Sequence, residues 1–171
     1  MDNYILMKHS KEIEELSKSL GFTKTLFLDK DFVLIKTDKK KELLDSLKKT
    51  KLLTVFHAKS EEMLRFALEK TKVNVVLGAE EINPKESVHF VRGGLDQITC
   101  KIASEQEKTI GFSFSSILES KSREKLLRRI SFNTKLCRKY KVSMLFSTFA
   151  RSKEELRSAK DMQAMFRLVS R

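Results

Sequence analysis

The sequence is poor in residues that break or cross-link a chain: 171 residues include one proline, five glycines, two cysteines and no tryptophan. So little proline and glycine excludes collagen-like and low-complexity disordered chains. Two cysteines, Cys100 and Cys137, exclude a disulfide scaffold and suit a reducing compartment. No apolar run approaches the roughly 18 residues of a membrane-spanning helix, and the apolar stretch near the N-terminus is too short for a signal peptide. We therefore expect a soluble cytoplasmic protein without membrane contact.

The chain is expected to form a single domain over residues 1–171, because no linker, internal repeat or low-complexity tract divides it. Short apolar runs predict strands at 4–7, 25–28, 32–36, 52–56, 73–77, 88–91, 109–114 and 142–147. Amphipathic stretches predict helices at 10–20, 38–49, 60–70, 93–105, 122–139 and 158–169. Ser10, Asp38, Ser60 and the pair Gly93-Gly94 are expected to begin the first four helices.

Strands that alternate with helices favour parallel pairing with right-handed crossovers, and so an α/β fold. The strand at 73–77 is almost continuously apolar, as in strands that are covered on both faces. With about eight strands available, an open doubly wound sheet and a closed parallel barrel both fit the pattern.

The net charge of +12 lies almost entirely in the C-terminal half. Residues 1–90 contain 17 basic and 15 acidic side chains, whereas residues 91–171 contain 18 and 8. A concentrated basic region attracts polyanions, and nucleic acid is the commonest of them. The alternative is a solvated, lysine-rich face with no partner.

In either architecture, functional groups gather where the strands end. Asp29, His57 and Glu80 stand at such ends and could share a metal ion, but the three histidines are scattered and form no metal-binding pair. These three residues are better explained as polar side chains that are exposed or hydrogen-bonded within the fold. We therefore expect no metal site and no catalytic residue. The strand ends also include Arg92, Ser113, Ser115 and Ser147. The serines lack an acyl-transfer elbow, and the two cysteines read as buried apolar residues.

No Walker loop and no GxGxxG motif is present. The segment Arg92-Gly93-Gly94 precedes a predicted helix, whose first backbone amides could hold a phosphate beside Arg92. A turn that needs glycine for its backbone is an equally good reading.

The predicted helix 122–139 has two contrasting faces. Its apolar side includes Leu126, Ile130, Cys137 and Tyr140, and Asn133 lies among them, where we expect its amide to bond to backbone. The opposite side is almost purely cationic, although charges in the last turn also complement the helix dipole. Its cations are Arg128, Lys135 and Lys139, with Lys125 and Arg138 at the margins. Phe132 projects among these cations. It could stack on a base, contact another protein, or be a partly buried surface residue.

The segment after the last predicted strand adds further cations, in a position where barrels and sheets bind ligands. They are Arg151, Lys153, Arg157 and Lys160. A short helix with solvated ends is the plainer reading.

Four segments of the C-terminal half form a joint pattern: Arg92-Gly93-Gly94-Leu95-Asp96, Ile110-Gly111-Phe112-Ser113-Phe114-Ser115, Arg129-x₃-Asn133-x₂-Leu136-Cys137-Arg138-Lys139-Tyr140-Lys141-Val142 and Ser147-x₄-Ser152-x₃-Leu156-Arg157-Ser158-Ala159-Lys160-Asp161. Together they resemble one family, ribonuclease P protein component 3, the archaeal relative of the thirty-kilodalton eukaryotic RNase P subunit. The resemblance covers about residues 88–168, with Asp96 and Ala159 departing from the family pattern.

The resemblance implies a TIM-barrel-like α/β fold that is related to metal phosphoesterases of the polymerase-and-histidinol-phosphatase type but lacks their metal-binding residues. It leaves open whether the barrel closes in this chain. It also implies a non-catalytic subunit of the ribonucleoprotein that removes 5′ leaders from precursor tRNA. The implied partners are the catalytic RNA, which brings its own Mg²⁺, precursor tRNA and protein component 2; the protein binds no cofactor.

The charge pattern and the resemblance both favour RNA binding. Phe132 is the candidate for a protein contact. Two other readings remain: a metal-dependent phosphoesterase of the same barrel family, and a protein-interaction module without RNA contacts. The cations expected to contact RNA are Arg92, Arg128, Lys135, Arg138, Lys139, Arg151, Lys153, Arg157 and Lys160.

Overall fold

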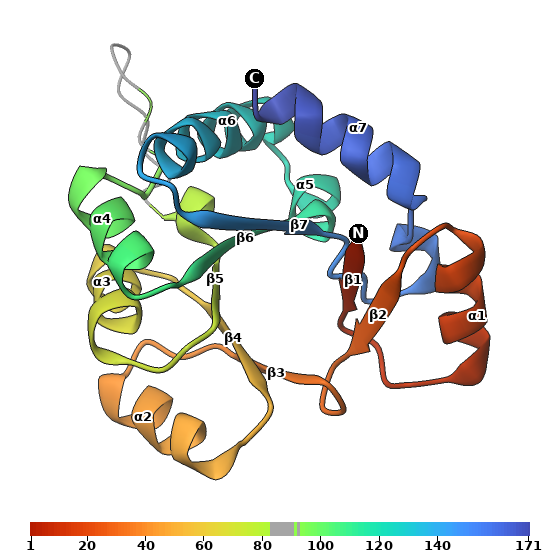
Figure 1. Ribbon diagram of the computed structural model, residues 1–171, viewed down its shortest axis with the longest axis horizontal. Coiled ribbons are helices and arrows are strands. Elements are labelled where there is room, and N and C mark those ends of the chain that lie inside the picture. Colours follow the sequence, from red (N-terminus) through yellow and green to blue (C-terminus); the bar gives the residue numbers. More distant parts are fainter. Residues whose placement is uncertain (83–90, 92) are drawn as a thin grey trace.

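The computed structural model describes residues 1–82, 91 and 93–171. In this part of the chain, parallel strands curve around a common centre and helices cover them from outside (Figure 1). The strands are β1 (Asp2–Ile5), β2 (Lys24–Phe27), β3 (Phe32–Ile35), β4 (Leu53–His57), β5 (Val75–Leu77), β6 (Thr109–Ser113) and β7 (Ser143–Ser147). The helices are α1 (Lys11–Ser19), α2 (Lys40–Lys49), α3 (Glu61–Lys70), α4 (Gln97–Glu105), α5 (Phe114–Glu119), α6 (Arg123–Lys139) and α7 (Ala159–Val169), with the short 3₁₀ turns η1 (Ala79–Glu81) and η2 (Lys153–Glu155).

The strand order follows the chain, which distinguishes the two architectures that the sequence left open. Strands β1 and β2 form one sheet, and β3 to β7 form a second sheet in consecutive order, with every pair parallel. A doubly wound sheet would reverse its order at a switch point, and none appears among these strands. Single bridges, Leu28 to Phe32 and Ile5 to Ala150, connect the two sheets. The arrangement is therefore barrel-like. At its two junctions the sheets are connected by single bridges and not by continuous strand pairing.

Apolar side chains fill the space that the strands enclose. Because strand side chains alternate, Val55 and its neighbour Phe56 belong to different clusters, one inside the ring and one under the helices. The ring of Tyr4 lies 5.3 Å from that of Phe32 and 5.7 Å from that of Phe149, and all three are buried. Gly111 faces the same cluster, where a Cβ atom would lie 2.4 Å from a methyl carbon of Leu77. The interior is thus a packed core.

Buried polar groups attach the first strand to the last. Asn3 is fully buried, and its Oδ1 accepts hydrogen bonds from the hydroxyls of Thr148, at 2.6 Å, and Ser147, at 3.1 Å. The hydroxyl of Ser147 also accepts a bond from the backbone N–H of Tyr4 at 2.7 Å. Ser147, one of the serines at a predicted strand end, therefore holds the ring together.

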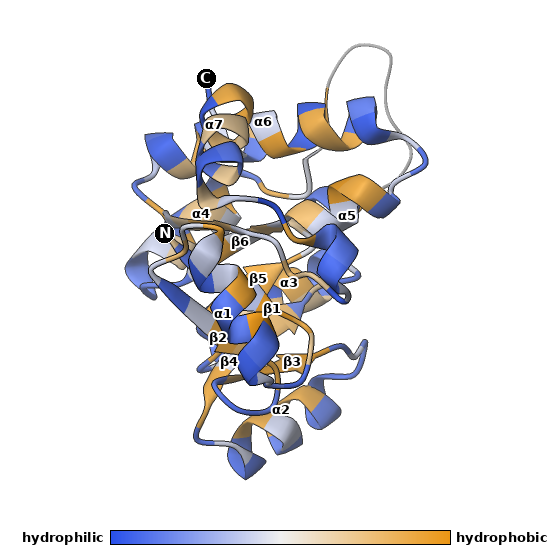
Figure 2. Ribbon diagram, turned by 90° about the vertical axis from the view of Figure 1, so that its right-hand side faces the viewer, coloured by the Kyte–Doolittle hydropathy of each residue, from blue (hydrophilic) through white to orange (hydrophobic). Residues whose placement is uncertain are grey.

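The larger core cluster lies between the strands and the covering helices. Figure 2 shows the helices with hydrophilic residues outward and hydrophobic residues toward the strands. Ser10, Ser60 and Ser158 cap α1, α3 and α7 through their hydroxyls. These caps confirm the predicted starts of three helices. Within the described part of the chain, no helix combines the length and apolar composition needed to cross a membrane.

Four local predictions need correction or stay open. Helix α2 is not capped by Asp38, because Lys39 occupies the N-cap position without a side-chain bond and Asp38 lies 4.0 Å from the ammonium of Lys59. Helix α4 begins at Gln97, three residues after the pair Gly93-Gly94. Helix α5 was not foreseen, since its six residues are too short to show a period. The predicted strand 88–91 lies almost wholly outside the described residues.

Candidate nucleic-acid interface

Helix α6 is fixed against the body by the apolar face that the sequence predicts. Leu126, Ile130 and Cys137 are buried there. Asn133 is fully buried as well, and its Nδ2 donates to the backbone oxygen of Gly93 at 2.6 Å. The expected inward orientation and backbone bond of Asn133 are confirmed. This orientation turns the cationic face of α6 outward.

The two glycines before α4 allow the chain to pass close to its neighbours. A Cβ atom at Gly94, where φ is +85°, would lie 1.8 Å from the backbone oxygen of Ala79. One at Gly93 would lie 2.2 Å from Oδ1 of Asn133. The structure thus favours the interpretation that this turn needs glycine for its backbone, over the interpretation that the start of the helix binds phosphate. The first turn of α4 is instead capped by Asp96, whose Oδ1 accepts from the N–H of Thr99 at 2.7 Å.

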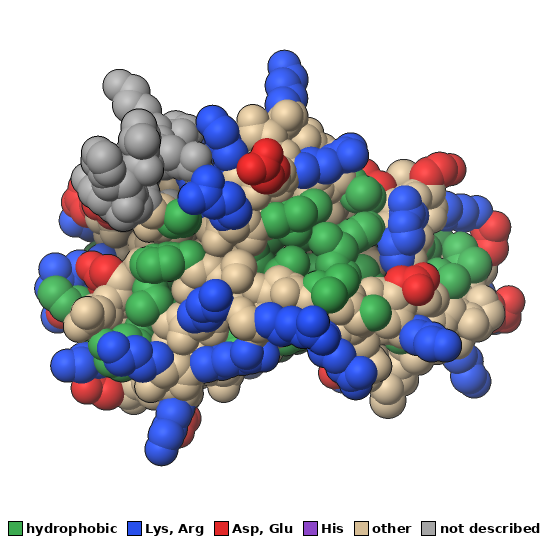
Figure 3. Space-filling view, turned by 90° about the horizontal axis from the view of Figure 1, so that it is seen from above, with side chains coloured by type: hydrophobic (Ala, Val, Ile, Leu, Met, Phe, Trp, Pro, Cys, Tyr) green, Lys and Arg blue, Asp and Glu red, His purple; other side chains and the backbone are tan. Residues whose placement is uncertain are grey.

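Most cations on the outer face of α6 are free of acidic partners. Arg128, Lys135 and Lys139 are exposed and have no ion pair with any described residue. The ammonium of Lys139 lies 5.6 Å from the ring centre of Tyr140, and Nη2 of Arg138 donates to the hydroxyl of Ser170 at 2.9 Å. Figure 3, seen over α6 and α7, shows Lys and Arg predominating around an apolar patch. Such a surface suits phosphate neutralisation.

Phe132 shares this surface but is only 37% exposed. It packs beside Gly93, where an added Cβ atom would lie 2.8 Å from its ring. The interpretation of Phe132 as a partly buried surface residue therefore fits its position. It lines a hollow between α3, α4 and α6 that also includes Arg65 and Asp96.

The cations after β7 are engaged with neighbouring groups, in contrast to those on α6. Arg151 pairs with Glu119, and Lys153 pairs with Glu12. Arg157 is half-buried: its Nη1 donates to the backbone oxygens of Glu154 and Leu156, both at 2.7 Å, and its guanidinium lies 5.7 Å from the ring centre of Phe114. Lys160 is exposed and forms no ion pair with a described residue. Arg92 lies outside the described residues.

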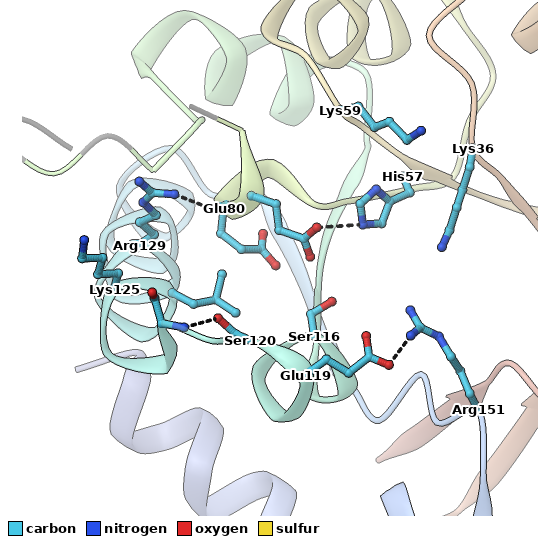
Figure 4. Close-up of a pocket in the computed structure, with 13 residues that line it drawn as sticks. Lys36, His57, Lys59, Glu80, Ser116, Glu119, Ser120, Lys125, Arg129 and Arg151 are labelled. Carbon is cyan, nitrogen blue, oxygen red and sulfur yellow. Dashed lines mark hydrogen bonds and ion pairs between the residues drawn. The ribbon is translucent and has the colours of Figure 1, made fainter. Parts of the chain in front are cut away.

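A polar cleft of about 500 Å³ opens at the carboxyl ends of β3 to β6, beside the first turns of α6 (Figure 4). Nε2 of His57 lies 3.4 Å from Oε2 of Glu81. The guanidinium of Arg129 donates to the backbone oxygen of Glu80 at 3.3 Å. The lining side chains are Lys36, His57, Lys59, Glu80, Glu81, Ser116, Glu119, Ser120, Ser122, Lys125, Leu126, Arg129 and Arg151.

Glu80 is the unusual member of this cleft. It is 1% exposed, and burial raises the pKa of its carboxyl to about 8. One of its oxygens, Oε2, has no hydrogen-bond partner. At neutral pH the side chain is therefore a protonated carboxylic acid, a donor rather than a charge.

The proposed trio Asp29, His57 and Glu80 is not brought together. Asp29 is exposed in the turn between β2 and β3, whereas His57 and Glu80 line the cleft. Among the described residues, no group of three or more His, Cys, Asp or Glu side chains is placed to hold a metal ion.

The remaining candidate nucleophiles are occupied in the fold. The hydroxyl of Ser113 caps α5, and that of Ser115 lies 2.8 Å from both the backbone oxygen of Thr148 and Oε2 of Glu155. Cys100 and Cys137 are fully buried. A hydrogen bond with Cys100, together with burial, raises the pKa of the Cys137 thiol, which keeps it protonated.

Sequence reasoning missed two of the cations that line the cleft. Lys36 and Lys59 follow β3 and β4. The signal was present, because lysines just after parallel strands point to the same end of a barrel. It was hidden because residues 1–90 are nearly neutral overall.

Three curated proteins, each named Ribonuclease P protein component 3, are similar to this chain. The one from Methanosarcina barkeri (strain Fusaro / DSM 804) is 27% identical over 164 residues, which is 94% of this chain and 65% of the relative. That from Methanosarcina acetivorans is 26% identical with the same coverage, and that from Methanocaldococcus jannaschii is 27% identical over 77% of this chain and 56% of the relative. The resemblance inferred for residues 88–168 is confirmed and extends over most of the chain. This chain spans about 65% of the length of the first two relatives.

Two solved structures share the fold of this chain. A chain in a cryo-EM structure of archaeal ribonuclease P with mature tRNA matches with a TM-score of 0.70 and 22% identity, over 99% of this chain and 72% of that one. A crystal structure of an uncharacterized protein matches with a TM-score of 0.51 and 9% identity, over 82% of this chain and 38% of that one. No protein-family model matches the chain.

Proposed function

We propose that this chain is a protein subunit of ribonuclease P, which binds the catalytic RNA and supports removal of 5′ leaders from precursor tRNA. The observation that supports it most is the similarity to three proteins named Ribonuclease P protein component 3 along most of the chain. The further partners would be precursor tRNA and protein component 2, in the cytoplasm. We also propose that the barrel is related to the polymerase-and-histidinol-phosphatase enzymes.

The geometry supports RNA contact through the outer face of α6. Arg128, Lys135 and Lys139 stand on one rigid helix, exposed and without acidic partners among the described residues. Cations held in this way neutralise backbone phosphates without first breaking an ion pair. Structured RNA offers a protein mainly its shape and its phosphates, which suits a charged helix face.

Reconstitution tests this function directly. The catalytic RNA, Mg²⁺ and the other protein subunits are combined with or without the chain, and cleavage of precursor tRNA is measured. We expect the chain to raise cleavage at limiting Mg²⁺, because protein cations share the task of neutralising RNA. Equal cleavage with and without the chain would contradict the proposal.

The rival phosphoesterase makes the opposite prediction for the isolated chain. We expect no nuclease or phosphoesterase activity with Mg²⁺ or Mn²⁺, since the cleft residues His57, Glu80 and Glu81 are engaged with one another or buried. Reproducible hydrolysis that is abolished by His57→Ala would instead establish the phosphoesterase. An interaction module without RNA contacts would bind its partner with little dependence on salt.

A further inference from the structure

The cleft at the carboxyl ends of β3 to β6 is separate from the outer face of α6 and has no role in the proposed RNA contact. Elements far apart in sequence contribute to it, from Lys36 after β3 to Arg151 after β7. Figure 4 shows Lys36, Lys59 and Arg151 on one side of it, Lys125 and Arg129 of α6 on the opposite side, and Glu80 between them. In parallel barrels this end of the strands is where ligands bind.

The charge around the cleft favours an anion. Five cationic side chains line it: Lys36, Lys59, Lys125, Arg129 and Arg151. Of the three carboxyls, Glu119 is paired with Arg151 and Glu81 lies beside His57, while Glu80 is uncharged at neutral pH. Lys59 is shared with Asp38 at 4.0 Å. A positive excess therefore remains, and Lys36 and Lys125 form no ion pair with a described residue.

Two buried polar atoms at the cleft lack partners. Oε2 of Glu80 and Nδ1 of His57 make no hydrogen bond, although both side chains line the cleft. An unsatisfied buried polar group costs about 1–3 kcal/mol, so such groups often mark a ligand position. A protonated carboxyl can donate to an oxyanion, which a carboxylate cannot.

We propose that this cleft binds a terminal phosphate group, with Lys36, Lys59 and Arg151 as its cationic contacts and Glu80 as a hydrogen-bond donor. A terminal phosphate has two charges and oxygens on three sides, which matches cations at the rim and a donor inside. The volume of about 500 Å³ accommodates the phosphate and part of the molecule attached to it. The proposal does not depend on the ribonuclease P role, because free phosphate is itself a ligand of this chemistry.

Titration of the full chain with inorganic phosphate, followed by amide NMR at constant ionic strength, tests the site. We expect saturable shifts confined to amides around the cleft, such as those of Lys36, Glu81 and Ser120. Substitution of Lys36→Gln with Lys59→Gln should weaken binding at least about fivefold, as loss of two charge-assisted contacts requires. The matched control is Lys18→Gln with Lys41→Gln, an equal charge change at exposed positions of α1 and α2. Equal weakening in both pairs, or shifts that never saturate, would overturn the proposal.

Two oligoribonucleotides, identical except for a 5′-phosphate or a 5′-hydroxyl, identify the source of the phosphate. Tighter binding of the phosphorylated form that vanishes in the Lys36→Gln, Lys59→Gln variant supports an RNA end as the ligand. Binding of inorganic phosphate alone supports a free phosphate. Equal occupation of the cleft by both oligoribonucleotides would overturn a terminal-phosphate site, whatever the RNA affinity of α6 proves to be.

The protonated donor predicts a pH dependence. A phosphate monoester is already a dianion above its second pKa of about 6, so its own charge is constant between pH 7.5 and 9. Binding should fall over this range as Glu80, whose pKa is about 8, becomes a carboxylate. The groups facing Glu80 are Glu81, His57, Ser116, Cys137 and Arg129. Glu80→Gln keeps a donor and should abolish the decline; a decline of equal size in this variant would contradict the role of Glu80.

Discussion

Helix α6 and the segment after β7 are both rich in cations, but the two regions use them differently. On α6, Arg128, Lys135 and Lys139 extend into solvent without acidic partners among the described residues. After β7, Arg151 and Lys153 are paired with glutamates, and Arg157 donates to two backbone oxygens. The difference shows that the number of basic residues in a segment does not measure the charge available to a ligand.

The comparison also distinguishes two reasons why a segment can be rich in basic residues. A long helix has a solvent face several turns long, and its cations there need no local partner. A segment that winds over a barrel end must satisfy its own backbone carbonyls, and arginine with five donors suits that task. Arg157 is therefore already engaged with backbone oxygens, whereas Arg128 has no acidic partner among the described residues.

The largest effect is expected from removal of the α6 charges. The variant Arg128→Gln, Lys135→Gln, Lys139→Gln should bind the catalytic RNA roughly a hundredfold more weakly near 0.1 M salt, with a salt slope shallower by about 2 to 3. Filter binding across a salt series measures both quantities. Lys11→Gln, an exposed lysine of α1, is the control and should leave both values unchanged. An unchanged slope in the triple variant would contradict RNA binding by α6.

A second substitution separates the position of α6 from its charge. Asn133→Ala removes the 2.6 Å bond to Gly93 and leaves a buried backbone oxygen without this donor. We expect a loss of about 1–3 kcal/mol in the free energy of unfolding, measured by denaturant titration. The salt slope of RNA binding should not change well below the melting temperature. Undiminished stability would mean that the bond contributes nothing.

Arg157→Ala should have a smaller effect, and on the fold more than on RNA. Loss of two bonds to backbone oxygens and of the contact with Phe114 should lower the free energy of unfolding by about 1 kcal/mol. The salt slope should change by less than half of one phosphate contact. A full unit of slope lost without loss of stability would show that Arg157 is available to RNA after all.

The smallest effect concerns the ion pair between Lys153 and Glu12. Both side chains are largely exposed, so a double-mutant cycle with Lys153→Ala and Glu12→Ala should give a coupling free energy of no more than about 1 kcal/mol. Glu12→Ala alone should release Lys153 and slightly strengthen RNA binding at low salt. Strengthening would sharpen the contrast with α6, and weakening would contradict it.

Much of the fold was readable from sequence because it depends on local pattern. Ser60 before an apolar period predicts α3, and the two-faced wheel from Leu126 to Cys137 predicts α6. The choice between an open sheet and a barrel was not local. It depends on the bridge between Ile5 and Ala150, which no window of neighbouring residues reveals.

The candidate sites were less accessible to sequence reasoning, for the same reason. The wheel identified the exposed cations of α6, since exposure follows from helix period. It did not reveal that Arg157 would bond to backbone or that Lys36 and Lys59 would line one cleft. Both facts depend on how distant loops fold over the strand ends.

The attachment of Asn3 and Tyr4 to Ser147 also sets an order of events during synthesis. These partners are 143 or more residues apart, so the first strand must wait until Ser147 has been synthesised before the ring can complete. At 5–20 residues per second this interval is roughly 7 to 30 s. During it, β1 can pair with β2 but presents an open edge, with Asn3 exposed to water. Until Ser147 is available, this open edge can pair with strands of other chains.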